Sequence, residues 1–357
     1  MLFAVFTLSA QHVHTAECGH LHTKGYAALD SLGVMIPFEF EQKAPSNDDI
    51  LVDIMYSGVC HSDIHSAFNH WEWTVYPYIP GHEIVGRVTE TGKNVTDLKV
   101  GDYVAIGAIN KYCGHCEMCL AWQEQYCLNS GGSFTEAGYS DKIVIPANVA
   151  FKLPKSAPLE KIAPLMCAGI TVYAPIKAAK VKTGDKVAVA GFGGLGHLAL
   201  MYAVSFGAEV TMFDISEDKR ELAYQLGAKK FVNENNPEEM TGMEGSFNSI
   251  FITISSKFDV NQYANMVRPL GNLAVIGIPA NKDAPLINTN AIPFGIHITK
   301  PYVGGVAETR EMLEYSATHN IYPMVEIIPI QEINTAFRNV IDGRVHFRYV
   351  IDMRSIK

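Results

Sequence analysis

The alternation of apolar and polar positions changes character once along the chain. From residue 23 to about residue 165, short β-branched runs are broken by glycine and proline, as is typical of strands joined by turns. The clearest runs are residues 50–55, 84–89 and 103–106. This part of the chain is therefore predicted to be rich in β structure.

Beyond residue 165 the order becomes strand, glycine turn, helix, strand. The predicted strands are residues 186–190, 210–213, 249–254 and 271–278, and the predicted helices are residues 195–206 and 218–226. Strands that alternate with helices favour a doubly wound parallel sheet. After Pro301 the pattern predicts mixed structure.

Length and composition limit the possible classes of protein. A chain of 357 residues favours two domains. A formal charge of -9 excludes a polyanion such as nucleic acid as the expected partner. No apolar stretch approaches the ~20 residues needed to span a bilayer, so no membrane association is expected. Residues 1–22 have no basic residue before their apolar start and are predicted to be a poorly ordered extension, not a signal peptide.

A glycine-rich turn follows the first predicted parallel strand and opens the next helix. The turn contains Gly191, Gly193, Gly194, Leu195 and Gly196 in a G-x-G-x-x-G pattern. Its glycines allow a tight turn and a close approach of the backbone to a pyrophosphate, whose charge lies at the helix N-terminus. The turn therefore predicts a dinucleotide site.

The second strand of this unit ends on an acidic residue, Asp214. A carboxylate there accepts hydrogen bonds from the ribose hydroxyls of NAD and repels the phosphate of NADP, so NAD is the preferred prediction. Two alternatives stay open. In the first, Asp214 only caps the helix that begins near Ser216 and has no cofactor role. In the second, Lys219 or Arg220 neutralises the 2′-phosphate of NADP.

Four cysteines are close enough in sequence to surround one ion. They are Cys113, Cys116, Cys119 and Cys127. Four thiolates suit structural zinc. An iron–sulfur cluster is the rival, but a ferredoxin run closes after three residues with a following proline, whereas here the last gap is seven residues.

Cys60, His82 and Cys167 form a second candidate metal set. Each alone is weak evidence, because a single cysteine or histidine is more often a core residue. Together, two thiolates and one imidazole leave a fourth position open, as in a catalytic zinc site. Since six of the seven cysteines fall in metal-ligand contexts, a reducing cytoplasm is the expected compartment.

Several motifs occur in one fixed order along the chain. They are Gly-Val-Cys-His-Ser-Asp at 58–63, Pro-Gly-His-Glu at 80–83, the four-cysteine loop, Met-Cys-Ala-Gly-Ile-Thr-Val-Tyr at 166–173, Gly-Phe-Gly-Gly-Leu-Gly-His at 191–197 and Phe-Arg-Tyr-Val-Ile-Asp at 347–352. In this order the chain resembles the cinnamyl alcohol dehydrogenase branch of the zinc-containing medium-chain dehydrogenases, from residue 23 to residue 353.

The resemblance implies a fold and a reaction. A GroES-like, β-rich catalytic domain would comprise residues 23–168 and 305–357, and a Rossmann domain would comprise residues 169–304. The chain would be a zinc-dependent alcohol dehydrogenase that moves a hydride between a nicotinamide cofactor and a primary alcohol or aldehyde, aromatic ones included. It would hold two zinc ions and form a homo-oligomer, either a dimer or a tetramer.

The resemblance also implies roles for single residues. Cys60, His82 and Cys167 would hold the catalytic zinc, with Glu83 behind the metal as a tuning or transient ligand. Asp63 would accept the other ring N–H of His82. In the same way, Ser62 would hydrogen-bond the reacting oxygen, His65 would exchange its proton with solvent, and Arg348 would reach the cofactor phosphates.

Other classes are rivals to this interpretation. Metal-independent quinone reductases lack the open zinc set, and polyol dehydrogenases usually replace the third thiolate with a carboxylate. A catalytically silent zinc protein would not need Ser62 and His65 together with the metal ligands.

Overall fold

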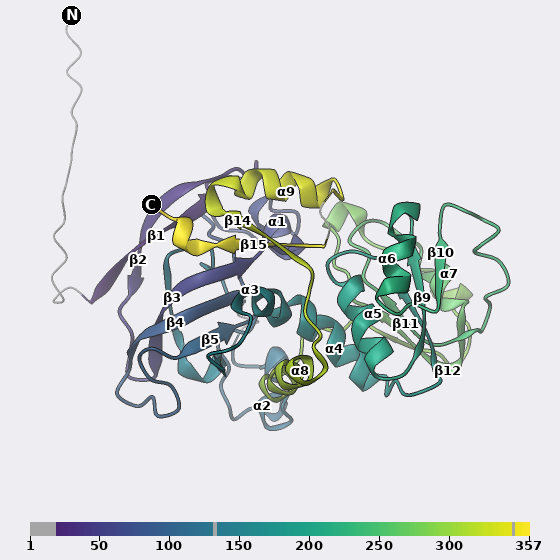
Figure 1. Cartoon of the computed structure of the whole chain (residues 1–357), viewed down its shortest axis with the longest axis horizontal. Coiled ribbons are helices and arrows are strands. Elements are labelled where there is room, and N and C mark those ends of the chain that lie inside the picture. Colours follow the sequence, from purple (N-terminus) through teal and green to yellow (C-terminus); the bar gives the residue numbers. More distant parts are fainter. Residues whose placement is uncertain (1–18, 131–133, 345–346) are drawn as a thin grey trace, which may run out of the picture.

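The computed structural model describes residues 19–130, 134–344 and 347–357. The chain forms two sheet-based bodies that lie side by side along its longest axis (Figure 1). One body is built on a mixed seven-stranded sheet and the other on a six-stranded parallel sheet.

The seven-stranded sheet contains strands from both ends of the chain. Its path is β14-β15-β3-β4-β5-β7, with β6 paired to β3. The strands are β3 (Asp49–Gly58), β4 (Ile84–Thr91), β5 (Tyr103–Ile106), β6 (Lys142–Pro146), β7 (Ala150–Leu153), β14 (Val325–Pro329) and β15 (Arg348–Asp352). Because β15 pairs antiparallel with β3, the C-terminal strand lies against residues of the first third of the chain.

The parallel sheet has the order β10-β9-β8-β11-β12-β13. Its strands are β8 (Lys186–Ala190), β9 (Glu209–Asp214), β10 (Lys230–Asn233), β11 (Phe247–Ile252), β12 (Val267–Val275) and β13 (His297–Thr299). The predicted doubly wound sheet is confirmed. The strand order reverses between β8 and β11, and such a switch point is where open parallel sheets bind ligands.

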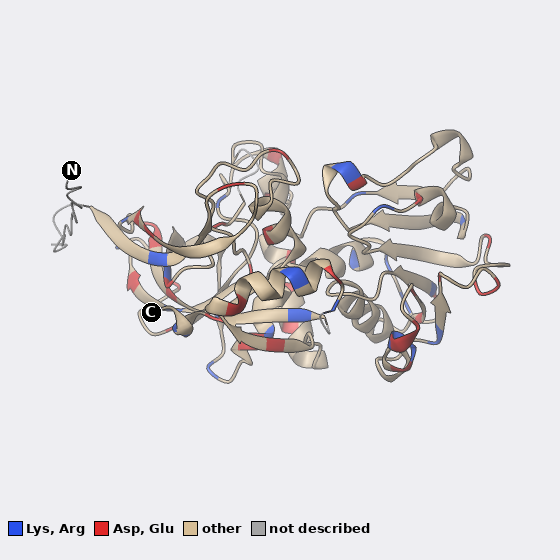
Figure 2. Cartoon of the chain, turned by 90° about the horizontal axis from the view of Figure 1, so that it is seen from above, with Lys and Arg blue, Asp and Glu red and all other residues tan. Residues whose placement is uncertain are grey.

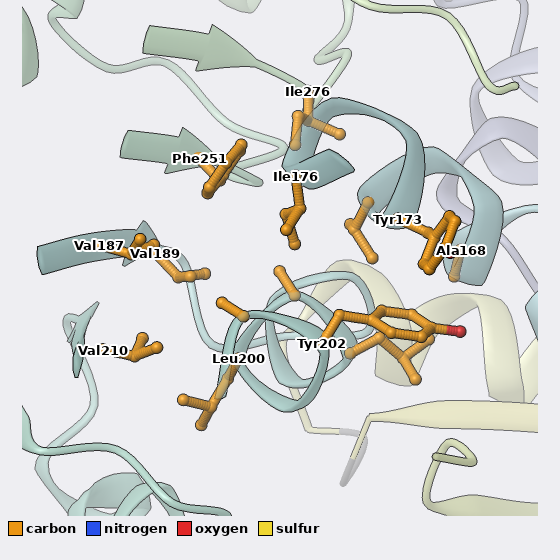
Figure 3. Packing of buried hydrophobic residues seen from close by; sticks show 14 of the residues in the cluster. Ala168, Tyr173, Ile176, Val187, Val189, Leu200, Tyr202, Val210, Phe251 and Ile276 are labelled. Carbon is orange, nitrogen blue, oxygen red and sulfur yellow. The ribbon is translucent and has the colours of Figure 1, made fainter. Parts of the chain in front are cut away.

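Helices cover the parallel sheet and join the two bodies. They include α4 (Ala168–Ala178), α5 (Gly196–Ser205), α6 (Arg220–Gln225), α7 (Val260–Ala264) and α8 (Val306–His319), while α1 (His61–Ala67), α2 (Glu117–Leu120), α3 (Leu159–Ile162) and α9 (Ile333–Ile341) accompany the mixed sheet. Figure 3 shows Ile176 of α4 and Leu200 of α5 packed against Val187 and Val189 of β8. These side chains are almost wholly buried, so the last turn of α4 is fixed against the parallel sheet.

The prediction of a poorly ordered extension through residue 22 is wrong for its last residues. Strand β1 (His20–Ala28) begins at His20 and pairs with β2 (Met35–Lys43). The ladder opposes His20 to Lys43 and His22 to Glu41, and backbone pairing of this kind orders a segment irrespective of its hydropathy. Residues 1–18 lie outside the described part of the chain.

Charged side chains of both signs are distributed over both bodies (Figure 2). Among the described residues no single helix is long and apolar enough to cross a membrane. One bent pair, Leu159–Met166 with Ala168–Ala178, passes by length and composition together.

Candidate metal centres and cofactor site

Four buried donors meet where the two bodies adjoin. One donor atom each of Cys60, His82, Glu83 and Cys167 lies within 4.8 Å of all the others. Cys60 is the N-cap of α1 and Cys167 is the N-cap of α4, while His82 and Glu83 directly precede β4. The predicted open set is thus brought together, with Glu83 as a fourth candidate ligand.

Asp63 fixes the orientation of His82. The His82 Nδ1 atom lies 3.0 Å from the Asp63 carboxylate, which also accepts hydrogen bonds from the backbone N–H of Cys60 and Gly81 and from the hydroxyl of Tyr139. The other nitrogen, Nε2, is buried and has no hydrogen-bond partner among the described residues. With Nδ1–H donating to Asp63, the lone pair of Nε2 is available to a metal, as expected for a ligating histidine.

The charges of this set suit a divalent cation. A hydrogen bond from Cys167 lowers the pKa of Cys60 well below its usual value, and the same bond raises the pKa of Cys167. Burial raises the pKa of Glu83 to about 8, although Arg348 opposes the shift. Two sulfurs, one imidazole and one carboxylate are donors that zinc accepts.

Arg348 lies between the metal set and the glycine-rich turn. It is 5% exposed and forms an ion pair with Glu83. A Cβ atom at Gly194 would lie 2.8 Å from its Cδ atom, so only glycine allows this approach. The predicted phosphate ligand is therefore paired with Glu83 and in contact with the predicted phosphate-binding turn.

Ser62 and His65 both belong to α1, beside the metal set. The His65 Nδ1 atom lies 3.0 Å from Nδ1 of His70, and its Nε2 atom is buried without a partner among the described residues. Burial, followed by the charges of His61 and His70, lowers the pKa of His65 to about 4. The ring is therefore a neutral imidazole with one end toward His70.

The four cysteines of the loop form a closed set. One sulfur each of Cys113, Cys116, Cys119 and Cys127 lies within 4.8 Å of the others. Backbone N–H groups of Cys113 and Cys116 donate to sulfurs of the set at 3.3 Å. Backbone hydrogen bonds lower the pKa of Cys113 to about 5, which favours the thiolate that a metal binds. Four sulfurs leave no position for substrate, so this set suits structural zinc.

The glycine-rich turn joins β8 to α5 as predicted, and Asp214 ends β9 beside it. A Cβ atom at Gly196 would lie 1.8 Å from the Gly191 carbonyl oxygen, which explains the glycine. The Asp214 carboxylate accepts the backbone N–H of Phe192 at 2.6 Å and lies 3.3 Å from the Lys219 ammonium.

Two further residues of this region escaped the sequence argument. His197 is wholly buried, and its Nδ1 atom lies 3.1 Å from the Gly193 carbonyl oxygen. His70 completes the imidazole pair with His65. The only sequence signal for His197 is its position directly after the G-x-G-x-x-G pattern. The five-residue spacing between His65 and His70 gives no signal, because it matches neither helical nor strand periodicity.

Together, the parallel sheet with its switch point, the open donor set and the closed cysteine set define a zinc-dependent dehydrogenase of the medium-chain class. Comparison with known proteins agrees. A family model for the alcohol dehydrogenase GroES-like domain matches residues 46–155, and a model for zinc-binding dehydrogenases matches residues 194–318.

Relatives and solved structures cover nearly the whole chain. A probable formaldehyde dehydrogenase of Bacillus subtilis is 40% identical, over 88% of this chain and 93% of its own. Cinnamyl alcohol dehydrogenase 2 of Rauvolfia serpentina is 38% identical, over 92% of this chain and 94% of its own. The structure of CAD from Helicobacter pylori complexed with NADP(H) is 39% identical, with a TM-score of 0.89, 95% of this chain and 100% of that chain covered.

The chain belongs to the zinc-containing medium-chain alcohol dehydrogenase family, and its fold is a GroES-like domain with a Rossmann-type sheet. It is an NAD(P)-dependent alcohol dehydrogenase and aldehyde reductase with a catalytic zinc site of cysteine, histidine and glutamate donors and a structural site of four cysteines.

Proposed function

We propose that this enzyme interconverts primary alcohols, aromatic ones included, and their aldehydes at the site of Cys60, His82 and Cys167. The observation that carries the proposal is the buried Nε2 of His82, which has no hydrogen-bond partner among the described residues. His82 belongs to a set whose donor atoms, the sulfurs of Cys60 and Cys167 included, lie within 4.8 Å of one another. Aromatic rings border this place. Phe134 lies with its ring centroid 4.5 Å from that of His82, and Trp71 lies 5.0 Å from His65.

In this proposal the bound zinc supplies a Lewis acid for the reacting oxygen, and the nicotinamide carries the hydride. Ser62 hydrogen-bonds the reacting oxygen from the first turn of α1. His65 accepts a proton at Nε2 during alcohol oxidation and returns it during aldehyde reduction, while its Nδ1 atom lies 3.0 Å from Nδ1 of His70. Arg348 binds the cofactor phosphates, because its contact with Gly194 places it beside the glycine-rich turn.

We propose NAD as the preferred cofactor. Asp214 is 6% exposed at the end of β9, where a ribose would need an acceptor. Both nearby basic residues are already paired, Lys219 with Asp214 and Arg220 with Glu217 and Glu239. A 2′-phosphate would therefore have to break an ion pair and approach a carboxylate.

The cofactor proposal is tested by kcat/KM for NADH and NADPH with one aldehyde. The wild type should prefer NADH, and Asp214→Ser should move the ratio toward NADPH by at least about tenfold, the effect of removing one close charge repulsion. A wild-type preference for NADPH, the cofactor in the Helicobacter pylori structure, would refute the proposal and would mean that Lys219 turns to the phosphate.

We further propose domains of residues 23–168 with 305–357 and of residues 169–304, a homo-oligomeric enzyme and a cytoplasmic location. The cysteines of both metal sets form no disulfide among the described residues, which supports a reducing compartment. No cofactor or substrate role is proposed for residues 1–22.

One experiment tests the activity itself. Metal-replete enzyme is analysed for zinc and then assayed for aldehyde-dependent oxidation of reduced cofactor over aromatic aldehydes, aliphatic aldehydes and ketose sugars. We expect two zinc ions per chain and turnover of aldehydes, with aromatic ones among the good substrates. A stoichiometry of one zinc, or turnover of ketose sugars alone, would contradict the proposal.

A further inference from the structure

The four-cysteine lobe, defined as residues 113–127, contacts the segment through which the chain returns from the parallel sheet. Glu124 belongs to the 3-10 helix Glu124–Tyr126 of this lobe. The backbone N–H of Val306, the first residue of α8, donates to its carboxylate at 2.9 Å. Nearby, the backbone N–H of Tyr302 donates to the hydroxyl of Tyr126 at 3.3 Å. Figure 1 shows the lobe helix α2 beside α8.

Glu124 does the work of an N-cap for a helix that begins 182 residues later. The N-cap of α8 is Gly305, which has no side chain to satisfy the first amides of the helix. No larger residue fits there, because a Cβ atom at Gly305 would lie 2.2 Å from the Trp122 carbonyl oxygen. Glu124 is 4% exposed, so a buried carboxylate from the lobe faces the positive end of α8.

Helix α8 in turn packs on the helix that begins at a catalytic ligand. Met312 of α8 is wholly buried, and a Cβ atom at Gly169 of α4 would lie 3.3 Å from its sulfur. The Tyr173 hydroxyl of α4 donates to Glu311 of α8 at 2.8 Å. Cys167 is the N-cap of α4.

The returning segment itself borders the same place. A small cavity is lined by Met166, the neighbour of Cys167, and by Ile170, Val303 and Thr309. Val303 and Thr309 flank the end of α8 that Glu124 holds. Displacement of this helix end therefore changes the packing directly beside Cys167.

We propose that Glu124 is a positioning residue through which the four-cysteine lobe holds α8, and through α8 the N-terminus of α4 with Cys167. The inference rests on the proposed assignment of Cys167 to the catalytic set. The four-cysteine lobe would then not only stabilise the fold but also align the catalytic zinc site.

The test compares Glu124→Ala with Glu124→Gln, which keeps an oxygen acceptor for the Val306 amide. Glu314→Ala is the matched control, because Glu314 is an exposed carboxylate on α8 itself. Hydrogen exchange of the amides of residues 302–312, zinc content, unfolding temperature, kcat and KM are measured on full-length, metal-loaded enzyme.

Glu124→Ala should exchange faster at residues 302–312 and keep two zinc ions, while kcat/KM falls at least about tenfold, as for loss of a hydrogen bond to a charged group. Glu124→Gln should restore exchange and kcat/KM to within about threefold of wild type, since the acceptor remains. Glu314→Ala should behave as wild type.

Two results overturn the proposal. In the first, the amides of residues 302–312 exchange no faster in Glu124→Ala than in Glu314→Ala. In the second, these amides exchange faster in Glu124→Ala, but its kcat and KM stay at wild-type values. A drop in unfolding temperature with unchanged kcat/KM belongs to the second result and means a merely structural role. Cys167→Ser, assayed in parallel, separates failure of the catalytic assignment of Cys167 from failure of the positioning role of Glu124. If it retains wild-type turnover, the catalytic assignment fails, whereas exchange at residues 302–312 still reports on Glu124.

Discussion

Two buried imidazoles determine what the catalytic site can do with a proton and with a metal. In both His82 and His65 one ring nitrogen is engaged, by Asp63 and by His70, and the other is buried without a partner among the described residues. Because a neutral imidazole has one donor and one acceptor, the engaged nitrogen decides the character of the other. In the proposed mechanism the same kind of side chain therefore serves as a metal ligand at His82 and as a base at His65.

His65→Gln tests the relay. Burial lowers the pKa of His65 to about 4, so the ring is neutral and ready to accept a proton from mildly acidic pH upward. Alcohol oxidation by the variant should be at least about a hundredfold slower near pH 7, the lower end of the range for loss of a general base, and should recover toward alkaline pH as hydroxide replaces the base. The measurement is the pH profile of kcat/KM, with His319→Gln on the exposed side of α8 as control. An unchanged profile would exclude His65 as the relay.

At the scale of the element, helix beginnings supply three of the eight candidate metal ligands. Cys60, Cys116 and Cys167 are the N-caps of α1, α2 and α4. An N-cap side chain lies at the positive end of the helix dipole, a position that suits the negative charge of a metal-bound sulfur. Sheet strands place these helices, and the helices place the sulfurs.

The two metal sets should respond differently to loss of one sulfur. Cys116→Ser should lower stability by several kcal/mol, because a structural metal contributes its binding energy to folding, and surviving protein should keep partial activity. Cys60→Ser should abolish turnover and keep the fold. Thermal unfolding and zinc content of each variant, each with one zinc ion fewer, provide the measurement. Equal loss of stability in both variants would contradict the division into catalytic and structural sites.

His197 gives α5 and the glycine-rich turn a dependence on pH. Burial lowers its pKa to about 3, below the ordinary value of 6.5. His197 is therefore neutral in the folded protein and takes up a proton more readily in the unfolded chain. The free energy of unfolding is highest above about pH 6.5 and falls as pH drops toward 3.

Between pH 6.5 and 5 the free energy of unfolding of the wild type should fall by about 1.4 kcal/mol per pH unit more than that of His197→Gln, which has no titrating ring. Denaturant unfolding of both proteins at several pH values measures this difference. Parallel curves would mean that the pKa of His197 is not lowered in the folded protein.

At the scale of the whole molecule, the parallel sheet ends on a strand suited to a second copy of the chain. In the described part of the chain β13 pairs only with β12. Phe294, just before β13, is 100% exposed, and Ile287 is 51% exposed. An exposed edge with apolar side chains favours association, and a two-fold axis through it would pair β13 with its own copy.

Light scattering after gel filtration tests the oligomer. The wild type should have at least twice the mass of one chain, and Phe294→Asp combined with Ile287→Asp should shift it toward the monomer, because two charges would be buried in the interface. Ile341→Asp is the control, because Ile341 lies on α9 and is as exposed as Ile287. A monomeric wild type would refute the oligomer.

The sequence by itself determined the elements and the sites that are local. Four of the six parallel strands, the glycine-rich turn and the four-cysteine set were predictable because their residues are neighbours, so spacing alone restricts geometry. The short strands β10 and β13 were not predicted. The open metal set needed the family resemblance, since the three ligands come from separate segments. Only the tertiary structure decided that β1 begins at His20. It alone also decided two distant contacts: the ion pair of Arg348 with Glu83, 265 residues apart, and the hydrogen bond of Glu124 with Val306, 182 residues apart. The physical reason is that such contacts depend on how sheets and helices pack, and no periodicity along the chain encodes that packing.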